Sequence, residues 1–86
     1  MADAHDTDTS TWATTTLDAG DMGCGELVML LRVRLRAMPG QVLRVIARDG
    51  GAPEDLPAWC RMTRNDLVRH DPATHSFWIR SRADWP

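Results

Sequence analysis

Apolar residues recur with a helical period between residues 25 and 38. Four of them stand three, four and three positions apart: Val28, Leu31, Leu35 and Met38. This spacing places them on one face of a helix, with Arg32 and Arg36 opposite. Met29 widens the apolar stripe, and because a methionine at helical spacing is typical of a core, we expect Met29 to be buried. The pair Pro39–Gly40 then ends the helix.

A second helix is predicted from about Asp55 to Asn65. Aspartate is a common N-cap residue, and proline, here Pro57, is tolerated in the first turn of a helix. The apolar side of this helix carries Leu56, Trp59, Cys60 and Thr63. We therefore expect Cys60 to be buried. Asn65 is expected to take the left-handed conformation at the end of the helix, where glycine is the usual residue.

Alternating apolar and polar residues predict the strands. A threonine-rich run forms the first, over residues 12–18, and residues 41–48 form the second. The second strand has two distinct faces, with Leu43, Val45 and Ala47 on one and Arg44, Ile46 and Arg48 on the other. One face is therefore expected to be buried, while the other carries charge.

A hairpin is predicted near the end of the chain. Its strands span residues 67–70 and 75–82, joined by a turn at residues 71–74 that contains proline at a favoured position. The last strand alternates like the second, with Phe77 and Ile79 on one face and Trp78, Arg80 and Arg82 on the other.

The order β-α-β-α-β-β predicts an α+β fold, a two-layer sandwich with two helices on one face of a four-stranded mixed sheet. Because a helix connects the first two strands, these strands are expected to be parallel. The folded domain is assigned to residues 11–82. Residues 1–10 are expected to form a disordered acidic tail, and residues 83–86 a frayed C-terminal tail.

Charge is distributed unevenly along the chain. Residues 1–21 contain five acidic residues and no basic one, whereas residues 22–86 contain 10 arginines against seven acidic residues. The folded part is thus mildly basic, which favours acidic partners or RNA only weakly. Two cysteines without an apolar N-terminal stretch favour a reducing compartment, and no apolar segment is long enough to span a membrane. We therefore expect a cytoplasmic protein.

The candidate chemistry centres on Cys24, which follows a glycine-bearing turn and precedes the first predicted helix. A thiol in the first turn lies among unpaired amides at the positive end of the helix dipole, so its pKa should fall. Asp21 and Glu26 moderate this effect by repulsion. Gly25 and Leu27 keep amides that proline would lack, and we predict that residues 25–27 support a thiolate or a terminal sulfur on Cys24.

Other roles for the cysteines are less favoured. Nothing in the sequence brings Cys24 and Cys60 within bridging distance of each other, and Cys60 is better explained as a buried helix residue. A zinc site formed by Cys24, Cys60, His70 and His75 is less favoured still. Zinc sites usually show closely spaced ligand pairs, and His70 and His75 are the only candidate pair. We interpret these histidines as hairpin residues and predict neither a metal site nor a cofactor.

A non-catalytic binding module is the alternative interpretation. One face of the sheet is predicted to gather Arg44, Arg48, Trp78, Arg80 and Arg82. Such a face suits RNA or an acidic protein. The simpler interpretation is a solvated face with one exposed tryptophan. Classical hydrolase, kinase and dinucleotide-binding motifs are absent from the sequence.

Seven stretches resemble, in order and spacing, the TusA/SirA/YedF sulfur-carrier family. They cover about residues 16–82 and comprise Leu17–Asp18, Cys24, the helix through Met38, Pro39–Gly40, Val45–Asp49, Asp55–Cys60 and Asp66–Val68. The chain departs from the family's Cys-Pro-x-Pro signature, because Gly25 and Leu27 replace both prolines. Thr63–Arg64–Asn65 replaces the usual Thr-Gly-His.

The resemblance implies the same two-layer β-α-β-α-β-β sandwich. It also implies a sulfurtransferase that carries sulfur as a persulfide on one cysteine, which corresponds to Cys24. The implied partners are sulfur-donor and sulfur-acceptor proteins, such as a cysteine desulfurase or another persulfide carrier. The pathways implied are tRNA thiolation, cofactor biosynthesis and sulfur metabolism.

Overall fold

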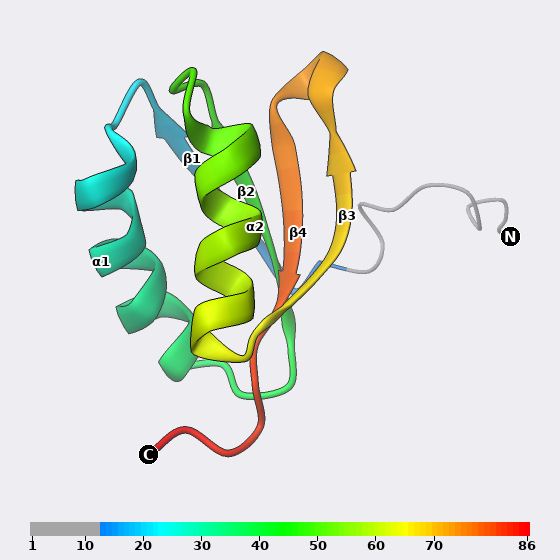
Figure 1. The fold of residues 1–86 in the computed structure, drawn as a ribbon. Helices are drawn as coiled ribbons and strands as arrows, with labels where there is room; N and C mark the ends of the chain where they lie inside the picture. Colours follow the sequence, from blue (N-terminus) through cyan, green and yellow to red (C-terminus); the bar gives the residue numbers. More distant parts are fainter. Residues whose placement is uncertain (1–12) are drawn as a thin grey trace, which may run out of the picture.

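A computed structural model describes residues 13–86, in which two helices cover one face of a four-stranded sheet (Figure 1). The elements are β1 (Thr15–Gly20), α1 (Cys24–Arg36), β2 (Val42–Ala47), α2 (Ala52–Thr63), β3 (Asp66–Asp71), a short 3-10 turn (Pro72–Thr74) and β4 (Ser76–Arg80). The predicted α+β fold is confirmed. The expectations for residues 1–10 and for Trp12 fall outside the described residues.

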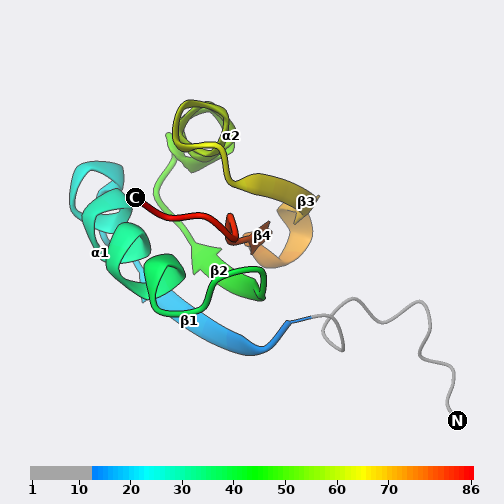
Figure 2. The same cartoon turned by 90° about the horizontal axis from the view of Figure 1, so that it is seen from below.

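The sheet has the strand order β1-β2-β4-β3. β1 and β2 are parallel, as the helical connection between them predicts, whereas β4 is antiparallel to both β2 and β3. The view from below, nearly along α2, shows both helices on the same face of the sheet (Figure 2). Because β1 and β2 are parallel, the loops that follow them leave the sheet at the same end. This arrangement positions the candidate site.

The core lies between the helices and the sheet. Leu31 and Leu35 of α1 are fully buried, as are Leu43 and Val45 of β2, so the helical stripe and the strand alternation are confirmed. Met29 is the exception, because 72% of its surface is exposed. On α1 it lies two residues before Leu31, which is nearly opposite the buried face in a helix of 3.6 residues per turn.

The predicted start and end of the second helix are wrong by a few residues. α2 begins at Ala52 with Gly51 as its N-cap, so Asp55 lies inside the first turn. At the other end Arg64, not Asn65, has the left-handed conformation, with φ of 65°. Asn65 is buried instead, and its side-chain oxygen accepts a hydrogen bond from the Arg82 amide at 2.8 Å. This bond ties the end of α2 to the segment after β4.

The C-terminal segment also differs from the expected frayed tail. Trp85 packs against the core, and its indole N–H donates to the Ser81 hydroxyl at 2.8 Å. The carbonyl of Pro86 accepts a hydrogen bond from Arg36 at 2.9 Å. Residues 85 and 86 are therefore docked beside α1. No helix within residues 13–86 is long and apolar enough to cross a membrane.

Candidate functional site

Cys24 is the first residue of α1. β1 ends at Gly20, whose φ of +58° suits glycine, and the chain turns to Gly23, the extended N-cap of the helix. No side chain caps this helix end. The predicted position of Cys24 in the first helical turn is therefore confirmed, and its side chain is half-buried.

The thiol of Cys24 makes a specific contact with the loop after β2. Its Sγ donates a hydrogen bond to Asp49 Oδ2 at 3.2 Å. The same carboxylate oxygen accepts the Gly51 amide at 3.1 Å, which holds the Asp49 side chain in place at the start of α2. The thiol thus links the start of α1 to the β2–α2 loop.

Asp55 completes a group of three side chains. The Sγ atom of Cys24 and one carboxylate oxygen from each of Asp49 and Asp55 all lie within 4.8 Å of one another. Within residues 13–86, this is the only group of three side chains whose potential metal-binding atoms are this close. Asp55 comes from the first turn of α2. A Cβ at Gly51 would lie 3.0 Å from the Asp55 carboxylate and 3.2 Å from that of Asp49, so only glycine fits here without a shift.

The pKa of the Cys24 thiol is raised, not lowered. Desolvation by burial is the main cause, and the hydrogen bond and negative charge of Asp49, together with the charge of Asp55, add to it, raising the pKa to about 12. The expected lowering by the helix terminus is therefore wrong. Both carboxylates come from the β2–α2 segment, and Asp49 is 25 residues away in sequence. The neighbours in sequence indicated only Asp21 and Glu26 as negative charges near the thiol.

The three residues after Cys24 differ in their burial and in the partners of their backbone amides. Gly25 and Glu26 are exposed, and the Gly25 amide is among the first-turn donors that a helix leaves unpaired. Leu27 is fully buried, and its amide donates to the Gly23 carbonyl at 2.9 Å. Leu27 was predicted to offer a free donor to a terminal sulfur, and this prediction is wrong.

The open face of the sheet places Arg44 and Trp78 together. The Arg44 guanidinium lies 5.2 Å from the Trp78 ring centre and donates to the Ser76 hydroxyl at 3.0 and 3.1 Å. Arg69, which sequence reasoning missed, lies 5.7 Å from the same ring. With both arginines over it, Trp78 is only 3% exposed, so the expected exposed tryptophan is wrong and the ring is not available for stacking on a base.

The other three arginines predicted to lie on the open face of the sheet are found in three different places. Arg80 is exposed in β4. Arg48 forms an ion pair with Asp18 at 3.1 Å at the end of the sheet. Arg82 lies beyond β4, where it contacts Asp84 and the Thr63 carbonyl at the end of α2. The structure therefore does not gather the five residues into one surface.

A cavity of about 270 Å³ lies beside the site. Asp49 lines it, as do Arg48, Phe77 and the two hairpin histidines, His70 and His75. His70 stacks on Phe77, with ring centres 4.2 Å apart. Neither histidine nor Cys60 belongs to the group around Cys24, so the alternative zinc set is not assembled. Cys24 and Cys60 are both free thiols.

Comparisons with known proteins identify the family of the chain. The sequence model of a family described as "Sulfurtransferase TusA" matches residues 15–81. The chain is 38% identical over 71 residues to a sulfur carrier protein TusA of Pseudomonas paraeruginosa, covering 79% of this chain and 90% of the relative. It is 38% identical over 72 residues to that of Pseudomonas entomophila (80% and 90% covered). A Pseudomonas putida TusA is 37% identical over 71 residues (79% and 89% covered).

Proposed function

The chain belongs to the TusA sulfurtransferase family, and on that premise we propose that it is a sulfur carrier in which Cys24 holds the sulfur as a persulfide. The observation that carries the assignment to Cys24 is its position. It is the first residue of α1, half-buried, and its sulfur is directed to Asp49 at the edge of the molecule where two loops meet. Cys60, by contrast, is 1% exposed.

The transfer is a thiol–persulfide exchange. Cys24 Sγ attacks the outer sulfur of a donor persulfide, the S–S bond of the donor breaks, and the donor leaves as a thiol after taking up the proton that Cys24 gives up. Cys24 is left as a persulfide, and no electrons are gained or lost overall. An acceptor thiol then attacks the outer sulfur on Cys24 and restores the free thiol.

The raised pKa keeps the Cys24 thiol of the free protein mostly protonated, so this thiol reacts slowly without a partner. With a pKa of about 12, only about one thiol in 10⁵ is ionised at pH 7. A partner that brings positive charge to Asp49 and Asp55 would weaken their effect and favour the thiolate. We infer that Cys24 is activated when a partner docks, because the chain itself places two carboxylates beside the sulfur.

The partners follow from this chemistry. Donor and acceptor proteins must each present a reactive sulfur to Cys24, and we propose a cysteine desulfurase as the donor. No resident cofactor takes part in the exchange. We place the reaction in the cytoplasm, where acceptor thiols stay reduced.

Intact-protein mass spectrometry after brief exposure to inorganic polysulfide tests the assignment. The wild type and Cys60→Ser are expected to gain about 32 Da per sulfur, in a form removed by dithiothreitol, whereas Cys24→Ser is expected to gain none. A gain that persists in Cys24→Ser, or no gain in the wild type, would refute the proposed role of Cys24.

A further inference from the structure

The open face of the sheet holds three hydrogen-bond donors around one indole ring. The guanidinium groups of Arg44 and Arg69 lie 5.2 and 5.7 Å from the centre of the Trp78 ring, one from each strand beside β4. The Nε1 atom of Trp78 is buried and has no hydrogen-bond partner within residues 13–86. Buried N–H groups almost always have a partner, so this group indicates an acceptor that residues 13–86 do not supply.

The acidic residues of the open face lie away from these donors. Asp18 is already in an ion pair, and the Asp71 carboxylate caps the 3-10 turn. Asp66 lies opposite Arg80 at the start of β3. No ion pair within residues 13–86 includes either arginine over the Trp78 ring. The centre of the face therefore suits a carboxylate from outside these residues, because charged donors and carboxylates form the strongest hydrogen bonds.

The chain enters the sheet beside the three donors. The Thr14 amide donates to the Val42 carbonyl at 2.8 Å, and Thr16 pairs with Arg44. Val42 pairs in turn with Arg80 of β4. Figure 2 shows the start of β1 on the side away from both helices. The segment that precedes β1 is thus attached next to the open face.

This preceding segment is acidic. Residues 1–12 contain no lysine or arginine and three aspartates: Asp3, Asp6 and Asp8. With adjacent strands about 4.8 Å apart, Arg69 of β3 lies about 14 Å across the sheet from β1. The five residues that connect Asp8 to Ala13 span about 17 Å when extended. A carboxylate of the segment can therefore reach both arginines over Trp78.

We propose that the acidic N-terminal segment, residues 1–12, docks on the open face of the sheet. An aspartate carboxylate lies between Arg44 and Arg69, and an oxygen of the segment accepts from Trp78 Nε1. Because the segment belongs to the same chain, its effective concentration at the face is on the order of millimolar. The docked segment covers the face that the sequence predicted to bind RNA or an acidic protein. Cys24 lies in the helical layer, so this inference is independent of the proposed function.

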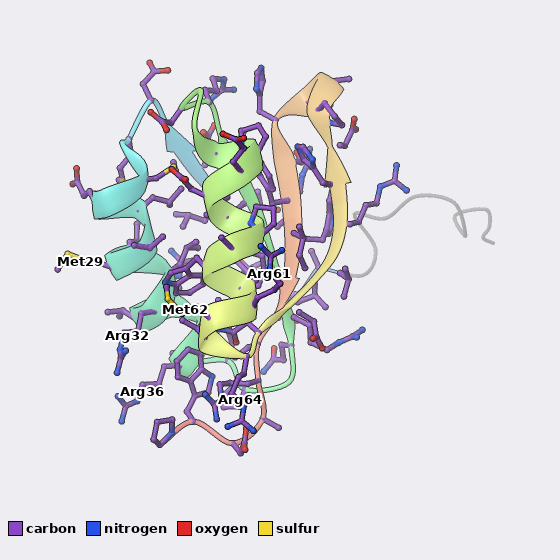
Figure 3. The ribbon with its side chains drawn as sticks, viewed as in Figure 1. Met29, Arg32, Arg36, Arg61, Met62 and Arg64 are labelled. Atoms are coloured by element: carbon purple, nitrogen blue, oxygen red, sulfur yellow. The ribbon has the colours of Figure 1, made fainter. Side chains whose placement is uncertain are left out.

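The helices provide a charge-matched control. Figure 3 shows Arg32, Arg36 and Arg61 extending from the helical layer, and all three are exposed. Arg61→Gln removes the same charge as Arg69→Gln, but from the opposite side of the molecule. An effect of the acidic segment that needs Arg69 and not Arg61 is therefore specific to the open face.

The test follows side-chain N–H signals by NMR in the ¹⁵N-labelled full chain. The segment variant is Asp3→Asn/Asp6→Asn/Asp8→Asn. The control variant removes the same charge at three exposed positions elsewhere: Asp21→Asn/Glu54→Gln/Asp84→Asn. Both are made in the wild-type, Arg69→Gln and Arg61→Gln backgrounds, and the spectra also show that each variant folds.

We expect the Trp78 Nε1–H and Arg69 Nε–H signals to shift in the segment variant and not in the control variant. The shift of the Trp78 signal should vanish at about 1 M salt, where the Debye length is about 3 Å. It should be the same after tenfold dilution, and it should be smaller in Arg69→Gln than in Arg61→Gln. An equimolar single-stranded polyuridine RNA should not shift the Trp78 signal of the wild type.

Four results would overturn the proposal. The first is that neither signal shifts in the segment variant, and the second is an equal shift in the control variant. The third is a shift that disappears on dilution, which would identify a second copy of the chain as the occupant. The fourth is a shift of the wild-type Trp78 signal by RNA, which would show that the face is open to other polyanions.

Discussion

The pKa of both cysteines is raised, but their surroundings differ. Burial is the main cause of the raised pKa of both thiols, which reaches about 12 in each case. Cys60 is enclosed by the core in the C-terminal half of α2, whereas Cys24 is half-buried at the first position of α1 and bonded to Asp49. A partner can change the surroundings of Cys24 without unfolding the protein. Two properties therefore distinguish the reactive thiol from the structural one: its accessibility to a partner, and a nearby negative charge that the partner can neutralise. The pKa of the thiol in the free protein does not distinguish them.

Replacing each cysteine separately with serine is expected to give the largest difference, measured as the rate of persulfide formation. Cys24→Ser should reduce persulfide formation by at least about 100-fold, because a hydroxyl is a far poorer nucleophile toward sulfur than a thiol. Cys60→Ser should change the rate by less than about twofold, since Cys60 is not exposed. The rates are measured by intact-protein mass spectrometry after short exposures of each variant to inorganic polysulfide. Similar losses in the two variants would contradict the difference between the two sites.

Asp49→Asn tests the effect of the carboxylate on Cys24. Asparagine keeps an oxygen that can accept from the thiol and from the Gly51 amide, but it removes the negative charge. The pKa of Cys24 should fall, and iodoacetamide should alkylate Cys24 about tenfold faster at pH 8, as expected for a pKa about one unit lower. Desolvation remains, so the pKa should not return fully to its ordinary value.

Alkylation of Cys60 provides the internal control for Asp49→Asn. Peptide mapping measures both thiols in the same sample, and the Cys60 rate should stay unchanged. An unchanged Cys24 rate would show that Asp49 does not oppose ionisation of the thiol. A faster rate at both cysteines would show that the substitution opens the fold instead.

The cysteines should also differ in their contribution to stability. Cys60→Ser places a hydroxyl in the core, and we expect a loss of about 1–3 kcal/mol in the free energy of unfolding unless the hydroxyl finds a partner within the helix. Cys24→Ser keeps a donor for Asp49 at a half-buried position and should cost less than about 0.5 kcal/mol. Urea unfolding of the two variants gives both values, and a larger loss for Cys24→Ser would contradict the assignment of Cys60 as the structural residue.

The pH dependence of stability tests the raised pKa of both thiols together. Both thiols have a pKa of about 12 when folded, against an ordinary value of 9.0, so the folded state keeps these protons at a pH where the unfolded chain has released them. Their contribution is fully present below pH 9 and is lost as the pH rises toward 12. The free energy of unfolding should therefore fall between pH 9 and 11. This fall should be smaller in Cys60→Ser, and an equal fall in both proteins would contradict the contribution of Cys60.

Local patterns predicted most of the fold because they depend on neighbours within an element. The stripe through Leu31 and Leu35 and the alternation of Leu43 and Val45 both identified buried residues correctly. Met29 was wrongly predicted to be buried because it was included in the apolar stripe, although it lies nearly opposite the buried face of the helix. Trp78 was misplaced because the arginines that cover it come from two neighbouring strands, and a register shift between Leu67 and Arg69 precedes the pairing of Arg69 with Trp78.

The sequence predicted the position of Cys24 and missed its surroundings. Asp49 and Asp55 are far from Cys24 in the chain and reach it only because β1 and β2 are parallel and end at the same side of the sheet. The predicted parallel pairing could have indicated this proximity, because the carboxyl ends of parallel strands meet at one edge of the sheet. The direction of the pKa shift was therefore wrong, although the residue was placed correctly at the helix start.

The central claim is that Cys24 receives sulfur, and labelled sulfur tests it most directly. The protein is incubated with a cysteine desulfurase and L-cysteine containing sulfur-34, alkylated and digested, and the label is located by tandem mass spectrometry. We predict that the labelled sulfur is found on the peptide that contains Cys24, is absent from the Cys60 peptide, and is lost when a reducing thiol is added. Label on Cys60, or on neither cysteine while polysulfide also leaves Cys24 unmodified, would contradict the claim.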